Sequence, residues 1–242
     1  MNRPEPASQE VLRRLLRGRG SKRNFVPVSR AFLQVPRPGG GAGPLAAFVS
    51  SRRKRALDLY LLIHAVASSP PYDVTLPARI WAQALGMPVN ASSTVTISTT
   101  LTWLEEMKLI QTSRVANARR IVLLADDGSG VPYQHPALAA MPERAGYFKL
   151  SFEYWLERWH TSLDLPATAV LLIALSLPER FVLPQRHGAK WYGISRDTLQ
   201  RGLKSLRDFG LLTYVPASKA APAAPMGMTV DRIYSLTGPL KL

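Results

Sequence analysis

A short stretch near the C-terminal end gathers hydrogen-bonding side chains at helical spacing. They are Ser195, Arg196, Thr198, Gln200, Arg201 and Lys204. Arginine and glutamine can each form two parallel hydrogen bonds, a geometry that fits the edges of guanine and adenine in a DNA major groove. The chemistry open to these residues is therefore the reading of base edges.

The residues around this stretch predict the helix that would hold it in place. Gly193 predicts a tight turn, and Ser195 is a good N-cap because its hydroxyl can accept from a first-turn N–H. Gly210 predicts a left-handed C-terminal cap, and an extended apolar run follows at 211–215. The residues of the apolar helix face are Leu199, Leu203 and Leu206.

Residues 192–212 resemble the recognition helix and first wing strand of winged helix-turn-helix proteins. The resemblance rests on Gly-Ile-Ser before a basic amphipathic helix and Gly-Leu-Leu after it. It implies that this helix enters a DNA major groove. The residues themselves leave a second interpretation open, an ordinary packed helix with a solvated charged face.

The apolar pattern of this stretch occurs twice, with an offset of 102 residues. The matching sets are Leu101, Leu104, Met107, Leu109 and Ile110, and Leu203, Leu206, Phe209, Leu211 and Leu212. We infer an internal repeat of one supersecondary unit. The β-branched run 94–97 is a poor helix former, so the first of the two helices is expected to begin late.

The first copy lacks the cationic face of the second. Ser98, Thr99 and Thr102 stand in its helix where the second helix has Gln200, Arg201 and Lys204. Hydroxyls give weaker base readout than arginine or lysine. The first copy is therefore expected either to read DNA shape, with arginines of its wing compensating, or to serve as a dimerisation module.

Two further basic clusters are candidates for phosphate contacts. One is the run Arg52, Arg53, Lys54 and Arg55, and the other is a hairpin tip with Arg114, Arg119 and Arg120. The run precedes an apolar helix, where cations oppose the helix dipole, and this conflict favours a role in phosphate binding. A merely solvated cluster is the alternative.

The net charge of the 242-residue chain is +15, which indicates a polyanionic partner. The first 55 residues hold 13 basic and two acidic residues, so most of the excess lies there. Residues 8–17 form a basic amphipathic segment that could dock on the protein, wrap nucleic acid or lie on a membrane. Arg17 and Arg19 form a weak match to a minor-groove arm.

The sequence lacks the motifs of several kinds of catalytic, metal and phosphate-binding sites. The chain has no cysteine, which excludes disulfides, iron–sulfur clusters and thiolate zinc sites. Its histidines, which do not lie at metal-ligand spacing, are His64, His135, His160 and His187. No phosphate-binding loop or nucleophile elbow is present. We therefore expect no enzymatic activity, no metal and no cofactor, and interpret His64 as a core residue.

No apolar run reaches 18 residues, and the N-terminus lacks the apolar segment of a signal peptide. Arginine exceeds lysine, and alanine and proline are abundant, which favours a bacterial source. The expected location is the cytoplasm, at the bacterial nucleoid, with no membrane partner.

The whole pattern predicts an α+β, mostly helical protein of two tandem winged-helix units. A basic, flexible arm (1–23) precedes unit 1 (24–127), a linker (128–145) and unit 2 (146–242). The opening of unit 2, Tyr147 to Ser151, resembles the winged-helix domains of bacterial plasmid and phage replication initiators and regulators. An aromatic helix from Phe152 to Leu163 is expected to pack into the core rather than to stack on bases.

The expected partner is double-stranded DNA, with a homodimer possible. Two units on one duplex face would lie about one helical turn apart, ~34 Å. We expect a sequence-specific transcriptional regulator. The alternatives are a plasmid or phage replication initiator or maintenance factor, and a winged-helix protein-interaction scaffold in a chromosome-organising complex.

Overall fold

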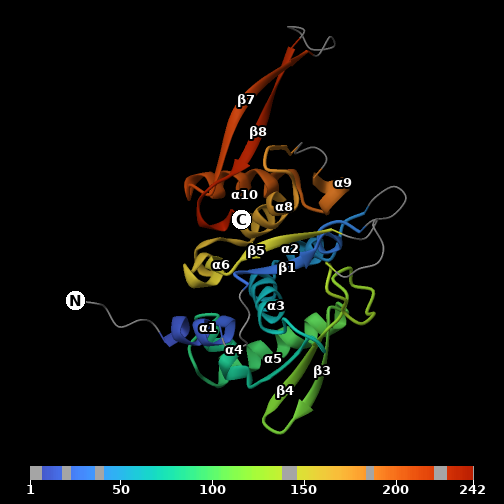
Figure 1. Cartoon of the computed structure of the whole chain (residues 1–242), viewed down its shortest axis with the longest axis vertical. Coiled ribbons are helices and arrows are strands. Elements are labelled where there is room, and N and C mark those ends of the chain that lie inside the picture. The colour runs from blue at the N-terminus through green and yellow to red at the C-terminus, as the bar shows by residue number, and fades with distance from the viewer. Residues whose placement is uncertain are drawn as a thin grey trace, which may run out of the picture.

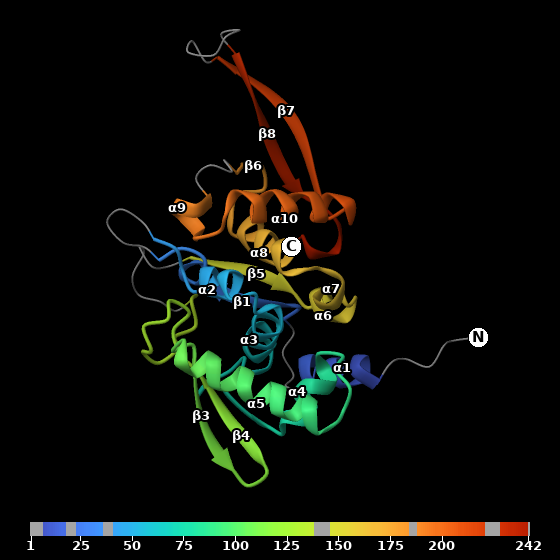
Figure 2. The same ribbon diagram turned by 180° about the vertical axis from the view of Figure 1, so that it is seen from behind.

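The computed structural model describes residues 7–17, 23–35, 41–137, 146–183, 188–220 and 228–241. Within them the chain is α+β and mostly helical, with small antiparallel sheets. The molecule is elongated, and a β-hairpin extends from each end of its long axis, as Figure 1 and Figure 2 show. The predicted α+β class is confirmed.

Unit 1 contains a helix, a strand, two more helices and a hairpin, in that order. The elements are α3 (Lys54–Val66), β2 (Asp73–Leu76), α4 (Ala78–Ala84), α5 (Ala91–Glu106), β3 (Ile110–Val115) and β4 (Ala118–Leu123). Strand β4 lies between β2 and β3, so the hairpin is completed by the strand that precedes its helices. Helix α3 is buried on every side, and the residues from Ala56 to Val66, most of them apolar, all lie in the interior.

Unit 2 repeats this order. Its elements are α8 (Leu165–Ser176), β6 (Phe181–Val182), α9 (Gly188–Tyr192), α10 (Arg196–Asp208), β7 (Leu212–Ala220) and β8 (Met228–Leu236). The strand order is again first, third, second, with β8 between β6 and β7. The internal repeat inferred from the apolar pattern is thus matched by a repeated topology.

The junction between helix and hairpin is the same in both units. The backbone N–H of Leu109 donates to Leu104 (3.1 Å), and that of Leu211 donates to Leu206 (2.9 Å). The residue before each donor is left-handed, Lys108 with φ 56° and Gly210 with φ 70°. The offset of 102 residues therefore describes backbone geometry, and Gly210 adopts the left-handed conformation expected of a C-terminal cap.

Helix α5 begins earlier than its β-branched run predicts. Asn90 is its N-cap and accepts from the backbone N–H of Ser93 at 2.9 Å. The helix continues through residues 94–97, where the hydroxyls of Thr94 and Thr96 bond to carbonyls four residues earlier. These bonds satisfy the hydroxyls locally, and packing of Ile97 in the core outweighs the weak propensity of the run.

A two-stranded ribbon joins the openings of the two units. Strand β1 (Phe25–Ser29) pairs antiparallel with β5 (Tyr147–Ser151), so that Phe25 faces Ser151 and Ser29 faces Tyr147. The two strands have the same pattern of sequence, and each residue pairs with the symmetric position of the other strand. The ribbon therefore has an approximate two-fold axis between the two units, in agreement with hairpins that extend in opposite directions (Figure 1).

Short helices follow each strand of the ribbon. They are η1 (Arg30–Phe32) and α2 (Leu45–Ser50) after β1, and α6 (Glu153–Leu156) and α7 (Trp159–Ser162) after β5. The aromatic helix expected at 152–163 is broken, because Arg158 is left-handed with φ 63°. Tyr154 and Trp155 are nonetheless fully buried, as the packing interpretation predicts.

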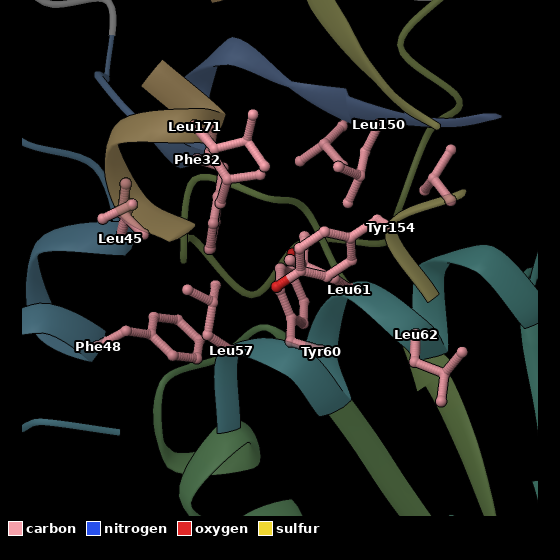
Figure 3. Packing of buried hydrophobic residues seen from close by; sticks show 14 of the residues in the cluster. Phe32, Leu45, Phe48, Leu57, Tyr60, Leu61, Leu62, Leu150, Tyr154 and Leu171 are labelled. Atoms are coloured by element: carbon pink, nitrogen blue, oxygen red, sulfur yellow. The ribbon is translucent and has the colours of Figure 1, made fainter. Parts of the chain in front are cut away.

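One apolar core runs through both units. Figure 3 shows aromatic residues of unit 1 beside Leu150, Tyr154 and Leu171 of unit 2. The ring of Phe32 contacts both Phe48 and Tyr60, with centroids 5.7 and 5.1 Å apart. The ribbon and this shared core hold the two units together.

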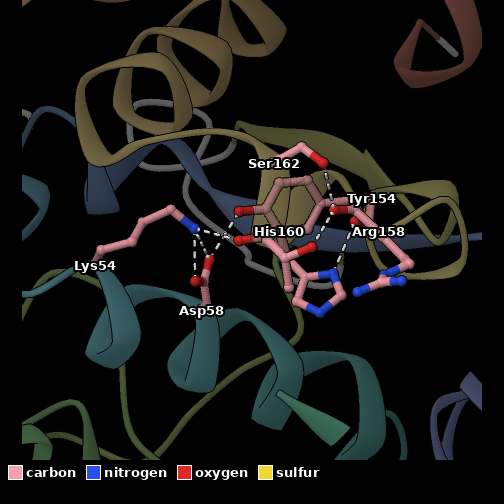
Figure 4. A network of polar contacts seen from close by, with 7 residues as sticks. Lys54, Asp58, Tyr154, Arg158, His160 and Ser162 are labelled. Atoms are coloured by element: carbon pink, nitrogen blue, oxygen red, sulfur yellow. Dashed lines mark hydrogen bonds and ion pairs between the residues drawn. The ribbon is translucent and has the colours of Figure 1, made fainter. Parts of the chain in front are cut away.

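A buried polar network also joins the units (Figure 4). Lys54 Nζ lies 2.6 Å from both carboxylate oxygens of Asp58 on α3 and donates to the carbonyl of His160 at 2.8 Å. The hydroxyl of Tyr154 donates to Asp58 at 2.8 Å. Burial raises the pKa of Asp58, although Lys54 and Tyr154 oppose that shift.

The helical part of the predicted arm docks on the body. Helix α1 (Ala7–Arg17) contacts α3 and α4 of unit 1 and α6 of unit 2. Leu12 and Leu16 are buried there, and Gln9 donates to the carbonyl of Trp155 at 3.4 Å. Of the three alternatives open for residues 8–17, the structure shows docking on the protein, because the apolar side of this segment is covered. The chain ends at a short turn, η3 (Gly238–Leu240).

Candidate nucleic-acid interface

The start of α10 follows the sequence prediction. Gly193 is left-handed with φ 63°, and the Ser195 hydroxyl accepts from the backbone N–H of Thr198 at 3.2 Å. Thr198 itself is buried, and its hydroxyl lies 2.9 Å from that of Ser195. Among the predicted readers on α10, Thr198 is therefore the one that the protein covers, and its hydroxyl is engaged beside the cap.

The remaining cationic and amide side chains of α10 lie on two neighbouring surfaces. One surface borders a groove of about 460 Å³ between α10 and the hairpin, which we call the hairpin groove of unit 2. Its lining residues are Arg196, Gln200, Leu203, Lys204, Arg207, Arg232 and Tyr234. Three of the predicted readers, Arg196, Gln200 and Lys204, thus come together.

Arg207 and Arg232 in this groove were missed by sequence reasoning. Their guanidinium groups lie 5.3 and 5.1 Å from the ring centre of Tyr214 on β7. Such stacking holds a guanidinium in place without neutralising its charge. Arg232 comes from β8, whose register with β7 brings it to α10, and no local pattern in the sequence reveals that placement.

The outer surface of α10 carries its charges in pairs. Arg201 Nε lies 3.0 Å from Asp197, and Lys204 Nζ lies 2.5 Å from Asp208. All four side chains are exposed, and exposed pairs four residues apart on a helix stabilise by only ~0.3–0.5 kcal/mol. A polyanion can therefore replace either carboxylate at little cost in stability.

Unit 1 has a hairpin groove at the equivalent place. Its volume is about 790 Å³, and it lies between α5 and the hairpin β3–β4. Subtracting 102 from the α10 residues of the unit 2 groove gives Thr94, Ser98, Leu101, Thr102 and Glu105, all of which line the unit 1 groove. The helix side of this groove is thus neutral or acidic, whereas that of unit 2 is cationic.

The cations of the unit 1 groove come from outside its helix. They are Arg79, Arg114 and Arg119. The carboxylate of Glu105 accepts from the backbone N–H and the hydroxyl of Thr112 at 2.7 and 3.0 Å, so the hairpin holds its charge in place. Arg120, also predicted to bind phosphate, instead reaches Asp73 on β2 at 2.5 Å.

A second groove borders the opposite side of α5. Its volume is about 580 Å³, and we call it the basic groove. Residues 51–56 form one wall, and Val95, Thr96, Thr99 and Thr100 form the other. Arg52, Arg53 and Arg55 are exposed at this wall, and the Arg53 guanidinium lies 5.1 Å from the ring centre of Trp103 on α5.

Lys54 does not belong to this exposed set. Its ammonium group bonds to Asp58 and to the carbonyl of His160 in the interior network, so a phosphate contact at Lys54 would compete with these two bonds. Of the proposed minor-groove arm, Arg17 is exposed at the end of α1, and Arg19 lies outside the described residues.

The hydroxyls predicted as readers in unit 1 are bound to their own helix. Thr99 donates to the carbonyl of Val95 at 3.0 Å, and Thr102 donates to that of Ser98 at 3.1 Å. Ser98 is half-buried. The polar groups that the sequence offers for base contacts at Thr99 and Thr102 are therefore directed to the helix backbone.

Histidine and carboxylate groups do not form a metal centre in the part of the chain that the structure describes. His64 is buried, as predicted, and its Nε2 lies 3.0 Å from Asp126. Asp126 also accepts from the Tyr60 hydroxyl and from the backbone N–H of Ser29, both at 2.8 Å. The sequence did not identify Asp126 as a buried acceptor, because its sequence context is that of a surface turn. The remaining histidine, His187, lies outside the described residues.

None of the described helices is long and apolar enough to cross a membrane. No family model, curated protein or solved structure matches the chain. The geometry of the grooves is therefore the basis for a functional proposal.

Proposed function

We propose that this chain binds double-stranded DNA in a sequence-specific manner through two winged-helix units and acts as a transcriptional regulator. The observation that carries the proposal is the setting of α5. A neutral helix face lies between two cationic walls, Arg52, Arg53 and Arg55 on one side and Arg114 and Arg119 on the other. A helix in a major groove has a phosphate backbone on each side, which is where these arginines stand.

Unit 2 supports the same interpretation with different chemistry. Arg196, Gln200 and Lys204 line its hairpin groove, and Arg207 and Arg232 stand beside them. The first three offer hydrogen bonds to base edges, each worth ~1–3 kcal/mol of discrimination when well placed. The other two, stacked on Tyr214, suit phosphates.

The ribbon β1–β5 bears on the form of the DNA site. Because the units are related by an approximate two-fold axis, their recognition helices would meet two half-sites in opposite orientation, about one helical turn apart (~34 Å). The reading faces differ, so the half-sites would differ in sequence. One chain would then bind an imperfect inverted repeat.

Selection of bound fragments from a random duplex library, followed by affinity measurements at several salt concentrations, tests the proposal. Replacing Arg196 and Lys204 together by alanine is expected to weaken binding to the selected duplex at least tenfold. Replacing Arg52, Arg53 and Arg55 by alanine is expected to flatten the salt dependence, with a loss of about 0.9 in slope per phosphate contact.

The matched control removes two exposed charges on α1, with Arg13→Ala and Arg14→Ala. It should leave affinity for the selected duplex within about twofold, because no residue of α1 lines either hairpin groove. Equal losses in the control and the α10 variant would indicate a general charge effect. A protein that binds no duplex at physiological salt would contradict the proposal and favour the scaffold function.

A plasmid or phage replication initiator is the second candidate. The observation that favours it is the opening of unit 2, whose sequence resembles that of such initiators and whose strand β5 pairs with β1. Footprinting on source DNA separates the two roles. A site within a promoter supports a regulator, and tandem sites beside an origin support an initiator.

A further inference from the structure

The middle of the exposed side of α5, between Ser92 and Glu106, is apolar although most of its residues are polar by name. Val95 is 64% exposed. Thr99 and Thr102 continue the same side of the helix, and each hydroxyl is bonded to the carbonyl four residues earlier. The other heavy atom on each threonine Cβ is a methyl group, so methyl groups remain to face outward. We call Val95, Thr99 and Thr102 the methyl stripe.

The equivalent side of α10 is ionic. An offset of 102 residues takes Val95, Thr99 and Thr102 to Asp197, Arg201 and Lys204, which carry two exposed ion pairs. The two helices thus share a backbone framework and differ in what they present. Unlike α10, helix α5 contains no lysine or arginine from Ala91 to Glu106.

The surroundings of the methyl stripe are nevertheless cationic. The basic groove places Arg52, Arg53 and Arg55 beside Val95 and Thr99. The hairpin groove places Arg114 and Arg119 beside Thr102. The arginines around the methyl stripe can attract a polyanion, and the methyl groups of the stripe can make apolar contacts with it.

We propose that the methyl stripe reads thymine by contact with the C5-methyl groups in the major groove of an A·T-containing half-site. Among the four bases of unmodified DNA, only thymine carries a methyl group in the major groove. Apolar side-chain groups, including the methyl group of threonine, make contacts with it. This inference rests on the proposed DNA-binding function and names the base that unit 1 recognises. Unit 1 is then a second unit that recognises bases.

The test replaces thymine by deoxyuridine, which removes the methyl group and leaves base pairing intact. Each thymine of the selected duplex is replaced in turn, and affinity is measured with the full-length protein. Losing one buried methyl contact should weaken binding about fourfold. Sensitive positions should cluster in one half-site, and their effect should be independent of salt, because no charge is removed.

Matched protein variants assign the effect to α5. Thr99→Ser and Thr102→Ser remove the methyl groups and keep the hydroxyls that bond to the helix, so folding is preserved. The double variant should bind the thymine duplex about as weakly as the wild type binds the deoxyuridine duplex. At the positions that Thr99 and Thr102 contact, it should also lose its discrimination between the two duplexes, as expected for coupled partners. Thr99→Val, which keeps a methyl group, should keep that discrimination.

The possible outcomes separate the two claims. If the protein binds its selected duplex but the serine variants discriminate thymine from deoxyuridine as well as the wild type does, the methyl stripe is not the reader and only this inference fails. Equal affinity of the wild type for all deoxyuridine duplexes would overturn it too. If no duplex is bound at all, the DNA-binding proposal and this inference fail together.

Discussion

Lys54 differs from the three arginines around it because its charge is used inside the protein. Its ammonium group contacts Asp58, one turn further along α3, and the carbonyl of His160. The sequence shows that Lys54 and Asp58 lie four residues apart, a spacing that brings them together on a helix. It does not reveal that Tyr154, nearly 100 residues away, completes the site. The basic run at 52–55 therefore contains three exposed arginines, which are candidates for phosphate contacts, and one lysine whose charge is used inside the protein.

Replacing Lys54 by methionine tests the structural role of this cation. The change leaves the buried Asp58 carboxylate without its cation and should lower the free energy of unfolding by roughly 3 kcal/mol at neutral pH. The pKa of Asp58, already raised by burial, should rise further. A raised carboxyl pKa favours the folded state at low pH, and this advantage disappears as pH rises through the folded-state pKa.

Denaturant titrations at pH 5 and pH 8 measure this effect, and the variant should be relatively weaker at pH 8. Adding Asp58→Asn removes the unpaired charge and keeps an acceptor for Tyr154, so it should recover much of the loss. A Lys54→Met variant as stable as the wild type at both pH values would show that the network contributes little.

His160 gives the protein a sensitivity to acid. Burial lowers its pKa from 6.5 to about 4. The unfolded chain binds a proton there below pH 6.5, whereas the folded chain resists it, so stability present above pH 6.5 is lost as pH falls toward 4. The loss attributable to this group is at most about 3 kcal/mol. His160→Gln should flatten the dependence of unfolding free energy on pH across that window, and an unchanged slope would contradict the assignment.

At the scale of elements, the equivalent helices α5 and α10 show what the sequence could predict. The apolar face with Leu199, Leu203 and Leu206 and the caps at Ser195 and Gly210 depend on short-range spacing, and each is found as predicted. The start of α5 was missed because propensity disfavours Thr94 to Ile97, while burial of Ile97 and the hydroxyl–carbonyl bonds favour a helix. Those terms depend on contacts that a local pattern does not contain.

The candidate site divides in the same way. Arg196, Gln200 and Lys204 could be assigned from one helix, because helical periodicity brings them together. Arg232, and the position of Arg52 to Arg55 beside α5, depend on tertiary packing. The burial of Thr198 could not be assigned in this way, because it depends on the inward direction of its side chain beside the Ser195 hydroxyl.

The end of α5 allows a test of the repeat in terms of stability. Lys108 is left-handed at the position where unit 2 has Gly210. A side chain in this conformation costs about 1 kcal/mol relative to glycine. Lys108→Gly should therefore raise the free energy of unfolding by up to about 1 kcal/mol, and Gly210→Ala should lower it by a similar amount. Opposite signs in chemical denaturation would support equivalent caps, and a loss in both would contradict them.

At the scale of the whole molecule, the units are held by elements that lie far apart in the sequence. Strand β1 pairs with β5 across more than 100 residues, and α1 contacts helices of both units. The predicted division into an arm, two units and a linker treats these segments as separate. The internal repeat in the sequence does not by itself indicate that these two similar strands pair antiparallel with each other.

Continuity of the core predicts how the protein unfolds. Because one apolar cluster and the Asp58–Tyr154 contact cross between the units, neither unit can open without exposing part of the shared interior. The chain should therefore unfold in a single cooperative transition, with equal calorimetric and van't Hoff enthalpies. Two separated transitions would show instead that the units are independent. If the two units bind DNA as proposed, their fixed separation should tolerate no inserted base pair between the half-sites, and the affinity for a duplex with a one-base-pair insertion measures that directly.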